Sequence, residues 1–186
     1  MFNISTFKEN LKVVRPNLFY VSMTLPPLLF TVSEKSVDAK TLDFRCEATE
    51  LPGRTVATYD DQSTGPTKKL AYDVTYNDIN LQIIASEDMN ERKYFEKWID
   101  NIVLPNNGNY NASLGGLVNY YSTYAAGQVS IFQLRDDGKQ IVKCNLYQAY
   151  PIMISPMNMS WEETNTYQRF TVTMTYRYHE TIFYKY

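Results

Sequence analysis

The last third of the chain carries the longest alternation of hydrophobic and polar positions. Residues 169–178 divide into Phe170, Val172, Met174, Tyr176 and Tyr178 on one side of a predicted strand, and Arg169, Thr171, Thr173, Thr175 and Arg177 on the other. This period-two pattern indicates that one face packs on a core while the other meets solvent or a neighbouring molecule. At about 3.3 Å per residue the strand would be roughly 33 Å long, beyond the usual length. Such a strand in a small protein favours a structural role in an assembly over catalysis.

Shorter alternations along the rest of the chain predict further strands. They cover residues 18–25, 42–49, 69–76, 79–85, 128–134 and 139–148. Arg135–Gly138 separates the last two, and its Asp-Gly pair is a strong hairpin signal. Turn-forming residues also interrupt the pattern at Leu51–Gly53 and across 60–66, where we expect loops.

One segment has helical rather than strand periodicity. Asp88, followed by Glu91 three residues later, resembles a capping box at a helix start. The apolar positions that follow share one helical face: Phe95, Trp98, Ile99 and Ile102. The helix should end before Pro105, and its amphipathic pattern predicts that it lies on a sheet. One helix among many strands predicts a mainly-β fold.

We expect residues 1–186 to form a single domain, because no linker or repeat divides them and their number supports one hydrophobic core. Residues 1–17 are interpreted as an arm or short helix that ends at the proline of the Arg-Pro-Asn sequence. Residues 26–40 are interpreted as a small excursion after the first strand. Residues 106–127, rich in Asn, Gly, Ser and Tyr, predict a long loop that is functional or forms an interface.

Composition excludes some functions and favours others. The chain has 18 basic and 20 acidic residues and a net charge of −2, which argues against a protein that grips phosphate backbones. Tyrosine occurs 16 times and suits half-buried sheet surfaces and subunit contacts. No window approaches the apolar length of a membrane span, and residues 1–14 lack the apolar run of a signal peptide. We therefore expect a soluble protein made in a cytoplasm.

The sequence predicts no catalytic, cofactor-binding or metal-binding site. His179 is the single imidazole and lies at a predicted strand end, where we expect a solvated, structural side chain. The adjacent carboxylates are Asp60-Asp61, Asp136-Asp137 and Glu162-Glu163. Such neighbours point apart in strands and are solvated in turns, so none forms an acid–base pair.

The remaining candidate motifs are equally weak. Gly115-Gly116 lacks the spacing and the lysine of a phosphate loop, and Lys68-Lys69 is too small for a nucleic-acid patch. Cys46 and Cys144 fall in phase with neighbouring apolar positions, which predicts two small core residues. Neither cysteine has metal-ligand spacing, and a disulfide between them stays open at this level.

Several segments, taken in order, resemble one protein family. They are Arg15–Phe19, Phe44–Gly53, Ile79–Ala85, Glu91–Asp100, Trp161–Thr173 and Tyr178–Glu180. Their joint order is similar to that of the tail tube proteins of contractile-tailed bacteriophages. The excursion at 26–40 and the loop at 106–127 depart from the usual compact form, which leaves the finer interfaces open. Baseplate proteins that initiate the tube and the tube component of type VI secretion share this architecture and stay as alternatives.

The resemblance implies two packed antiparallel sheets with one flanking helix. It also implies hexameric rings that stack into a hollow tube, each subunit lending four strands to an intersubunit barrel of twenty-four. With strands about 4.8 Å apart and tilted by about 40°, the backbone diameter would be roughly 48 Å, wide enough for a DNA duplex of about 20 Å. The implied partners are tail sheath, baseplate and tail terminator proteins, with tape-measure protein and genomic DNA inside the tube of a virion.

Two hypotheses and two alternatives accompany this interpretation. We hypothesise that polar strand faces form a mildly acidic lumen that repels phosphates, and that the arm and the long loop bridge subunits. Thr171, Thr173 and Thr175 face either the lumen, a neighbouring subunit or the sheath. A carbohydrate-binding β-sandwich, with tyrosines as stacking platforms, is the alternative from another class. A small enzyme is the third class, and the sequence supplies no nucleophile, base or metal set for it.

Overall fold

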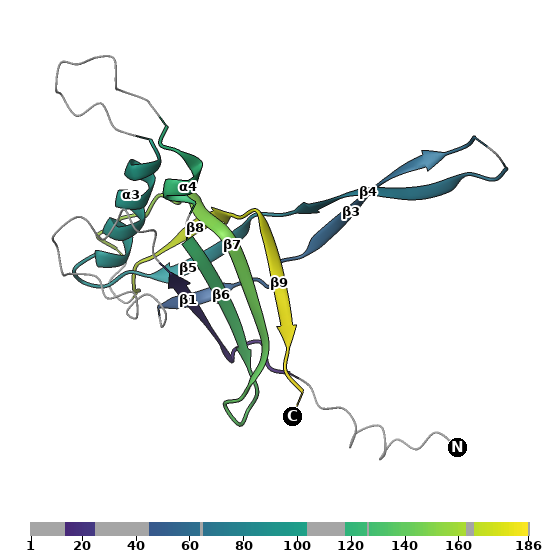
Figure 1. The fold of residues 1–186 in the computed structure, drawn as a ribbon. Coiled ribbons are helices and arrows are strands. Elements are labelled where there is room, and N and C mark those ends of the chain that lie inside the picture. Colours follow the sequence, from purple (N-terminus) through teal and green to yellow (C-terminus); the bar gives the residue numbers. More distant parts are fainter. Residues whose placement is uncertain are drawn as a thin grey trace, which may run out of the picture.

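The computed structural model describes residues 14–24, 45–63, 65–103, 118–125, 127–162 and 166–185. The fold is mainly β, as predicted, and its elements are β1 (Phe19–Thr24), β2 (Cys46–Thr49), β3 (Arg54–Asp61), β4 (Lys68–Tyr76), β5 (Ile79–Ile84), α3 (Asn90–Ile102), α4 (Tyr121–Tyr124), β6 (Gly127–Leu134), β7 (Gln140–Ile154), β8 (Arg169–Thr175) and β9 (Tyr178–Phe183). Figure 1 shows α3 at one end of the strands and the β3–β4 hairpin projecting away from them. The predicted excursion at 26–40, most of the arm and residues 106–117 of the long loop lie outside the described residues.

Strand β7 belongs to two antiparallel sheets and joins them. Its first part pairs with β6 on one side and with β9 on the other, and β1 pairs with the far side of β6. Its last part, Tyr150–Ile154, pairs with β8, and the order continues through β5 to β2. We call β1-β6-β7-β9 the first sheet and β7-β8-β5-β2 the second sheet. The predicted pair of antiparallel sheets is confirmed.

The two sheets share one hydrophobic core. Its members with at most 2% exposure include Val21, Ile131 and Leu146 from the first sheet, and Leu81, Val172 and Met174 from the second. Burial of each such side chain contributes about 1.5–3 kcal/mol. Inward and outward positions alternate along β8, so the predicted inward positions 170, 172 and 174 are confirmed. In β1 the buried residues are Val21 and Met23.

The chain turns a corner within β7 at Gln148. This residue has a φ of 55°, a left-handed conformation that is uncommon outside glycine. The register with β6 skips Gln148, so it is the extra residue of a β-bulge, which bends a strand and increases its twist. The side chains of Arg177 and Tyr121 lie on the corner, donating to Oε1 of Gln148 at 3.4 and 3.5 Å. The bulge lies where β7 passes from the first sheet into the second.

The predicted strand over 169–178 is two strands in the structure. β8 ends at Thr175 and β9 begins at Tyr178, because the chain leaves the second sheet there and enters the first. Tyr178 is 44% exposed, so the prediction that it shares the buried face is wrong. The longest strand is instead β7, with 15 residues. The sequence did not predict its continuation past Gln148, because the bulge shifts the alternation by one residue and Pro151 is atypical of a strand interior.

Helix α3 is not capped by Asp88 as predicted. The residue before the helix, Met89, is left-handed with a φ of 53°, and no side chain caps the helix start. The carboxylate of Glu91 instead accepts hydrogen bonds from the N–H and hydroxyl of Ser86, at 3.0 and 2.7 Å, and pairs with Arg45 Nε at 3.1 Å. Burial alone would raise the pKa of Glu91, but these bonds and the arginine charge lower it. Glu91 therefore fastens the helix start to the residue before β2.

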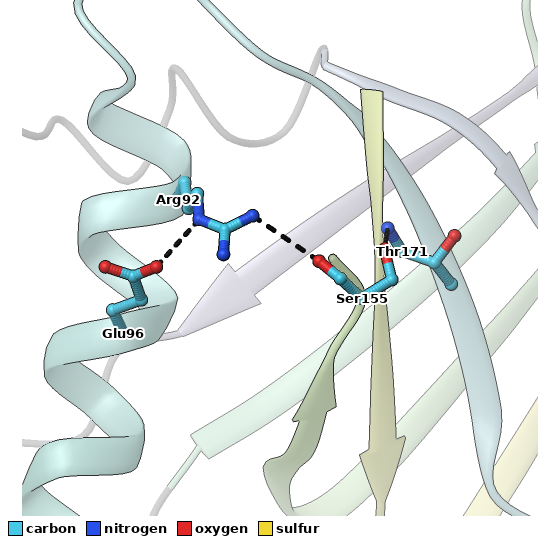
Figure 2. A network of polar contacts seen from close by, with 4 residues as sticks. All are labelled: Arg92, Glu96, Ser155 and Thr171. Atoms are coloured by element: carbon cyan, nitrogen blue, oxygen red, sulfur yellow. Dashed lines mark hydrogen bonds and ion pairs between the residues drawn. The ribbon is translucent and has the colours of Figure 1, made fainter. Parts of the chain in front are cut away.

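Helix α3 is also tied to the connection that follows β7. Figure 2 shows Arg92 Nε against the Glu96 carboxylate at 2.7 Å, while Nη1 donates to the carbonyl of Ser155 at 3.4 Å. The hydroxyl of Ser155 accepts a hydrogen bond from the N–H of Thr171 at 2.8 Å. This network joins α3, the end of β7 and β8.

No helix in the described part of the chain is long and apolar enough to cross a membrane.

Both cysteines are free thiols that pack in the sheets. Cys144 is 1% exposed and belongs to the core, and Cys46 packs against it from β2. Burial raises the pKa of both thiols, that of Cys46 to about 12. Because the thiolate is the reactive form, both react poorly at neutral pH. The predicted packing role is confirmed, and the two form no disulfide.

Replacing the corner residue tests the importance of its conformation. We expect Gln148→Val to lower the free energy of unfolding by about 2 kcal/mol, because a β-branched side chain is strained at positive φ. Urea denaturation of both proteins measures the difference. The matched control is Gln82→Val on a regular strand, where valine fits and the change should stay within about 0.5 kcal/mol. Equal effects at the two positions would show that the left-handed conformation does not matter.

Candidate assembly surfaces

The adjacent carboxylates named in the sequence analysis lie at three separate places on the surface. Asp60 and Asp61 end β3 opposite Lys69 and Lys68. In the β6–β7 turn, Asp136 Oδ1 lies 3.6 Å from Arg15 Nε, and Asp137 Oδ2 lies 4.0 Å from the Lys139 ammonium. Glu162 lies in the connection between β7 and β8, and its neighbour in sequence is outside the described residues. Among the residues that the structure describes, no three His, Cys, Asp or Glu side chains gather to hold a metal ion.

His179 is half-buried rather than solvated, so that part of the prediction is wrong. Its ring packs edge-on against Tyr76 and Tyr176, with centroid distances of 5.2 and 5.9 Å. Its Nδ1 atom is buried and finds no hydrogen-bond partner in the described part of the chain. Burial lowers the pKa of His179, and the nearby charge of Arg54 lowers it further. The imidazole is therefore uncharged at neutral pH, and it packs between aromatic rings at the base of the β3–β4 hairpin.

Titration of His179 predicts loss of stability in acid. Its folded-state pKa lies below the ordinary value, so the unfolded chain takes up the proton first as the pH falls. We expect the melting temperature to drop as the pH falls below about 6.5, the unfolded pKa. The drop should level off once the pH is below the folded pKa.

Two variants check this origin of the pH dependence. Between about pH 7 and pH 5, a range that includes the ordinary histidine pKa, the melting temperature of His179→Gln should drop less than that of the parent. Arg54→Gln removes a repelling charge and should also reduce the drop while leaving the ring in place. An unchanged acid profile in His179→Gln would place the effect elsewhere.

The β3–β4 hairpin is a long antiparallel ribbon that the sequence only half predicted. β4 was expected, but β3 was not, because Arg54–Asp61 alternates weakly between polar and apolar residues. Its best signal is the turn-forming segment at 60–66, which lies between two β-prone runs. Figure 1 shows both strands leaving the sandwich together. Isolated two-stranded hairpins are marginally stable in water, so such a ribbon favours contact with another surface.

The hairpin exposes apolar and aromatic side chains on both strands. Val56 lies directly opposite Val74, with exposed fractions of 51% and 40%. Tyr59 lies opposite Leu70, and Tyr72 at 67% exposure lies with its ring 6.2 Å from that of Tyr59. Val56 and Tyr59 are three residues apart on β3, so period-two geometry places the Val56–Val74 pair and the Tyr59–Leu70 pair on opposite faces of the ribbon. Exposed apolar side chains on both faces of a projecting element mark it as an interaction site.

A second exposed aromatic site lies in the connection between β7 and β8. Trp161 is fully exposed and Met159 is 84% exposed. The root of this connection is held by the bonds of Ser155, and Gln168 Nε2 donates to the carbonyl of Asn158 at 2.9 Å. Tryptophan is rarely left in water without a partner, and it is enriched at binding hot spots.

The first sheet ends in two regular strands. The β1–β6 and β7–β9 pairings run without a register shift over six residues each. No described strand lies beyond β1 or β9. On β9 the N–H of Tyr184 bonds the carbonyl of Ile141 at 2.9 Å, so alternation directs the N–H groups of His179, Thr181 and Phe183 away from β7. The outer side of β9 can therefore accept another strand.

The second sheet ends less regularly. β2 has four residues and its register shifts between Cys46 and Ala48. At the other end, the last part of β7 contains Pro151, which lacks an N–H, and its register shifts before Met153. Bulges and proline are features that prevent edge strands from pairing. The two sheets therefore differ in their capacity for extension by another copy.

These features define a class of protein: a β-sandwich with a projecting hairpin and exposed apolar side chains. A family model described as "Phage tail tube protein" matches residues 14–182 of this chain. The chain belongs to the phage tail tube protein family, whose members are structural tube proteins. A search among curated protein sequences finds no match.

Solved structures share the fold at low sequence identity. One is a chain of the extracellular contractile injection system PVC sheath-tube complex, with a TM-score of 0.62 and 13% identity, covering 99% of this chain and 100% of that one. A chain of the PVC sheath/tube terminator has a TM-score of 0.62 and 13% identity over 91% and 96% of the two chains. A chain of the anti-feeding prophage cap has a TM-score of 0.60 and 14% identity, covering 92% of each chain. At these identities the likeness establishes the fold.

Proposed function

We propose that this chain forms hexameric rings that stack into the inner tube of a contractile phage tail, the conduit for genome delivery into the host. The observation that carries the proposal is the first sheet, four antiparallel strands that end in regular strands on both sides. Residues 1–186 act as a single tube domain, and the N-terminal arm and the loop at 106–127 bridge subunits.

The directions of β1 and β9 suit closure into a ring. Three successive antiparallel pairings separate them, so the two strands run in opposite directions. Around a ring axis, β9 of one copy therefore meets β1 of the next in antiparallel orientation. Four strands from each of six copies give the barrel of twenty-four that the family resemblance implies. Closure also removes edges that would otherwise promote uncontrolled association.

The β3–β4 hairpin then serves stacking of one ring on the next. Ring closure uses the edges of the first sheet and leaves the exposed apolar side chains on the two faces of the hairpin uncovered: Val56, Tyr59, Leu70, Tyr72 and Val74. A ribbon that projects from the sandwich reaches a subunit outside its own ring more readily than a flat surface would. A repeated head-to-tail contact of this kind generates an open stack rather than a closed pair.

The solved relatives support the choice of partners. They belong to a sheath-tube complex, a sheath/tube terminator and a baseplate, so we propose sheath, terminator and baseplate proteins as the partners of this chain in a virion. Tape-measure protein and DNA pass through the lumen without specific binding, after assembly in the host cytoplasm. The likeness to a chain of the anti-feeding prophage baseplate, with a TM-score of 0.59 and 12% identity, keeps a tube-initiator role as second candidate.

Ring closure is tested at Thr181 by negative-stain electron microscopy of the purified chain. The parent should form rings or hollow tubes with a sixfold end view. Thr181→Pro removes an outward N–H from β9 without breaking its pairing with β7, so it should stay monomeric. Thr181→Ala loses the same hydroxyl but keeps the N–H, and should assemble. A parent that stays monomeric even with a matching baseplate would contradict the proposal.

Stacking is tested separately on the hairpin. The double variant Leu70→Ser/Tyr72→Ser should form single rings that do not elongate, because the apolar surface between rings is lost. Thr58→Ala, another exposed position on the same ribbon, is the matched control and should form tubes of normal length. Circular dichroism and melting temperature should be unchanged in both proteins. Normal tubes from the double variant would remove the hairpin from the stacking contact.

A further inference from the structure

We infer that the outer face of the first sheet is the wall of the passage, and that this wall carries no net charge. The inference rests on the ring closure proposed above, which leaves one face of the first sheet toward the ring axis. The inner face is excluded, because Val21, Ile131 and Leu146 occupy it and are buried against the second sheet. The second sheet lies behind that core and cannot reach the passage.

Strand register identifies the residues of this wall. Three rows cross the sheet from β1 to β9: Tyr20, Phe132, Lys143 and Ile182; Ser22, Ser130, Asn145 and Glu180; Thr24, Gln128, Tyr147 and Tyr178. Hydroxyl, amide and aromatic groups dominate all three rows. The row members alternate along each strand with the core residues, as period-two geometry requires.

The wall has one positive and one negative side chain for each subunit. Among the twelve positions only Lys143 and Glu180 are charged. The Lys143 ammonium lies 5.2 Å from the centre of the Phe132 ring, within range of a cation–π contact. The Glu180 carboxylate accepts a hydrogen bond from the Tyr147 hydroxyl at 3.1 Å. Both charges therefore have a partner within the subunit.

The neutral polar groups also bind one another. Ser130 Oγ donates to Asn145 Oδ1 at 2.8 Å, and both side chains are buried although they lie on the outer face. Two aromatic pairs stack along the same face, Tyr20 with Phe132 and Tyr147 with Tyr178, at centroid distances of 4.3 and 4.8 Å. Groups that are already paired offer a passing chain few new hydrogen bonds.

This wall differs from the acidic lining expected from the net charge of the chain. Rings of Lys143 and Glu180 lie on neighbouring rows, so their fields cancel beyond a Debye length of about 8 Å at physiological salt. A polyanion moving along the axis is then neither held nor strongly repelled. The partner that fits the wall is a long polyelectrolyte in transit, and the balance of these two residues keeps it from binding.

The position of the wall is tested with single added cysteines. Glu180→Cys should place a maleimide-gold label inside the tube in end views, and Asn80→Cys, exposed on the second sheet, should place it away from the lumen. The native thiols do not compete, because burial raises the pKa of Cys46 and Cys144. Tubes with the Glu180→Cys label outside would overturn the wall and leave the proposed function intact. Absence of tubes from the parent would overturn both.

The charge balance is tested by co-sedimentation of tubes with a short fluorescent single-stranded DNA. Glu180→Gln leaves rings of unbalanced Lys143, so its tubes should bind the DNA at least about tenfold more tightly than parent tubes at low salt, and lose it as salt rises. Lys143→Gln/Glu180→Gln should bind no more than the parent. Glu47→Gln frees a cation on the second sheet, Arg169, and is the matched control. Binding by the parent, or by the control alone, would overturn the inference.

Discussion

The shared strand β7 is the constraint on which the rest of the structure depends. One continuous strand can serve two sheets only by bending sharply between them, and the left-handed bulge at Gln148 supplies that bend. The bend brings the inner faces of the two sheets together, so that Leu146 before it and Met174 across from it lie in one core. The outer face of the first sheet and the edges of β1 and β9 take their positions from the same bend.

The two sheets differ in how regular their edge strands are, and this difference suits them to different contacts. The first sheet ends in strands whose pairing is regular, whereas the bulge in β2 and Pro151 in β7 interrupt the ends of the second. One sheet is thereby suited to closing with copies of itself, and the other to carrying helix α3 and the exposed connection of Trp161 on the outside. The apolar hairpin adds a contact in a third direction. Separate surfaces of this kind would allow the proposed ring closure and stacking to be adjusted independently.

Electrostatics in such a tube depend on where charges lie rather than on their sum. The chain is mildly acidic overall, yet the strand faces of the proposed wall hold one lysine and one glutamate. Ion pairs elsewhere include Arg15 with Asp136 and Arg169 with Glu47, which lie at the surface. A polymer that must pass through quickly is served by a surface with little affinity and little barrier, because either would slow its motion.

Hydrophobic periodicity along the chain by itself determined the mainly-β fold, most strand positions, helix α3 and the inward positions of β8, since these depend on local periodicity and burial. The resemblance carried by the ordered segments also led to the family. Only the tertiary structure decided that 169–178 is two strands, that Glu91 binds Ser86 and Arg45 instead of capping α3, and that His179 packs between aromatic rings. Most of these features depend on contacts between residues far apart in sequence, such as Glu91 with Arg45 and His179 with Tyr76, and strand pairing leaves no local periodic signal. The wall residues were concealed for the same reason, because register across β1, β6, β7 and β9 selects them.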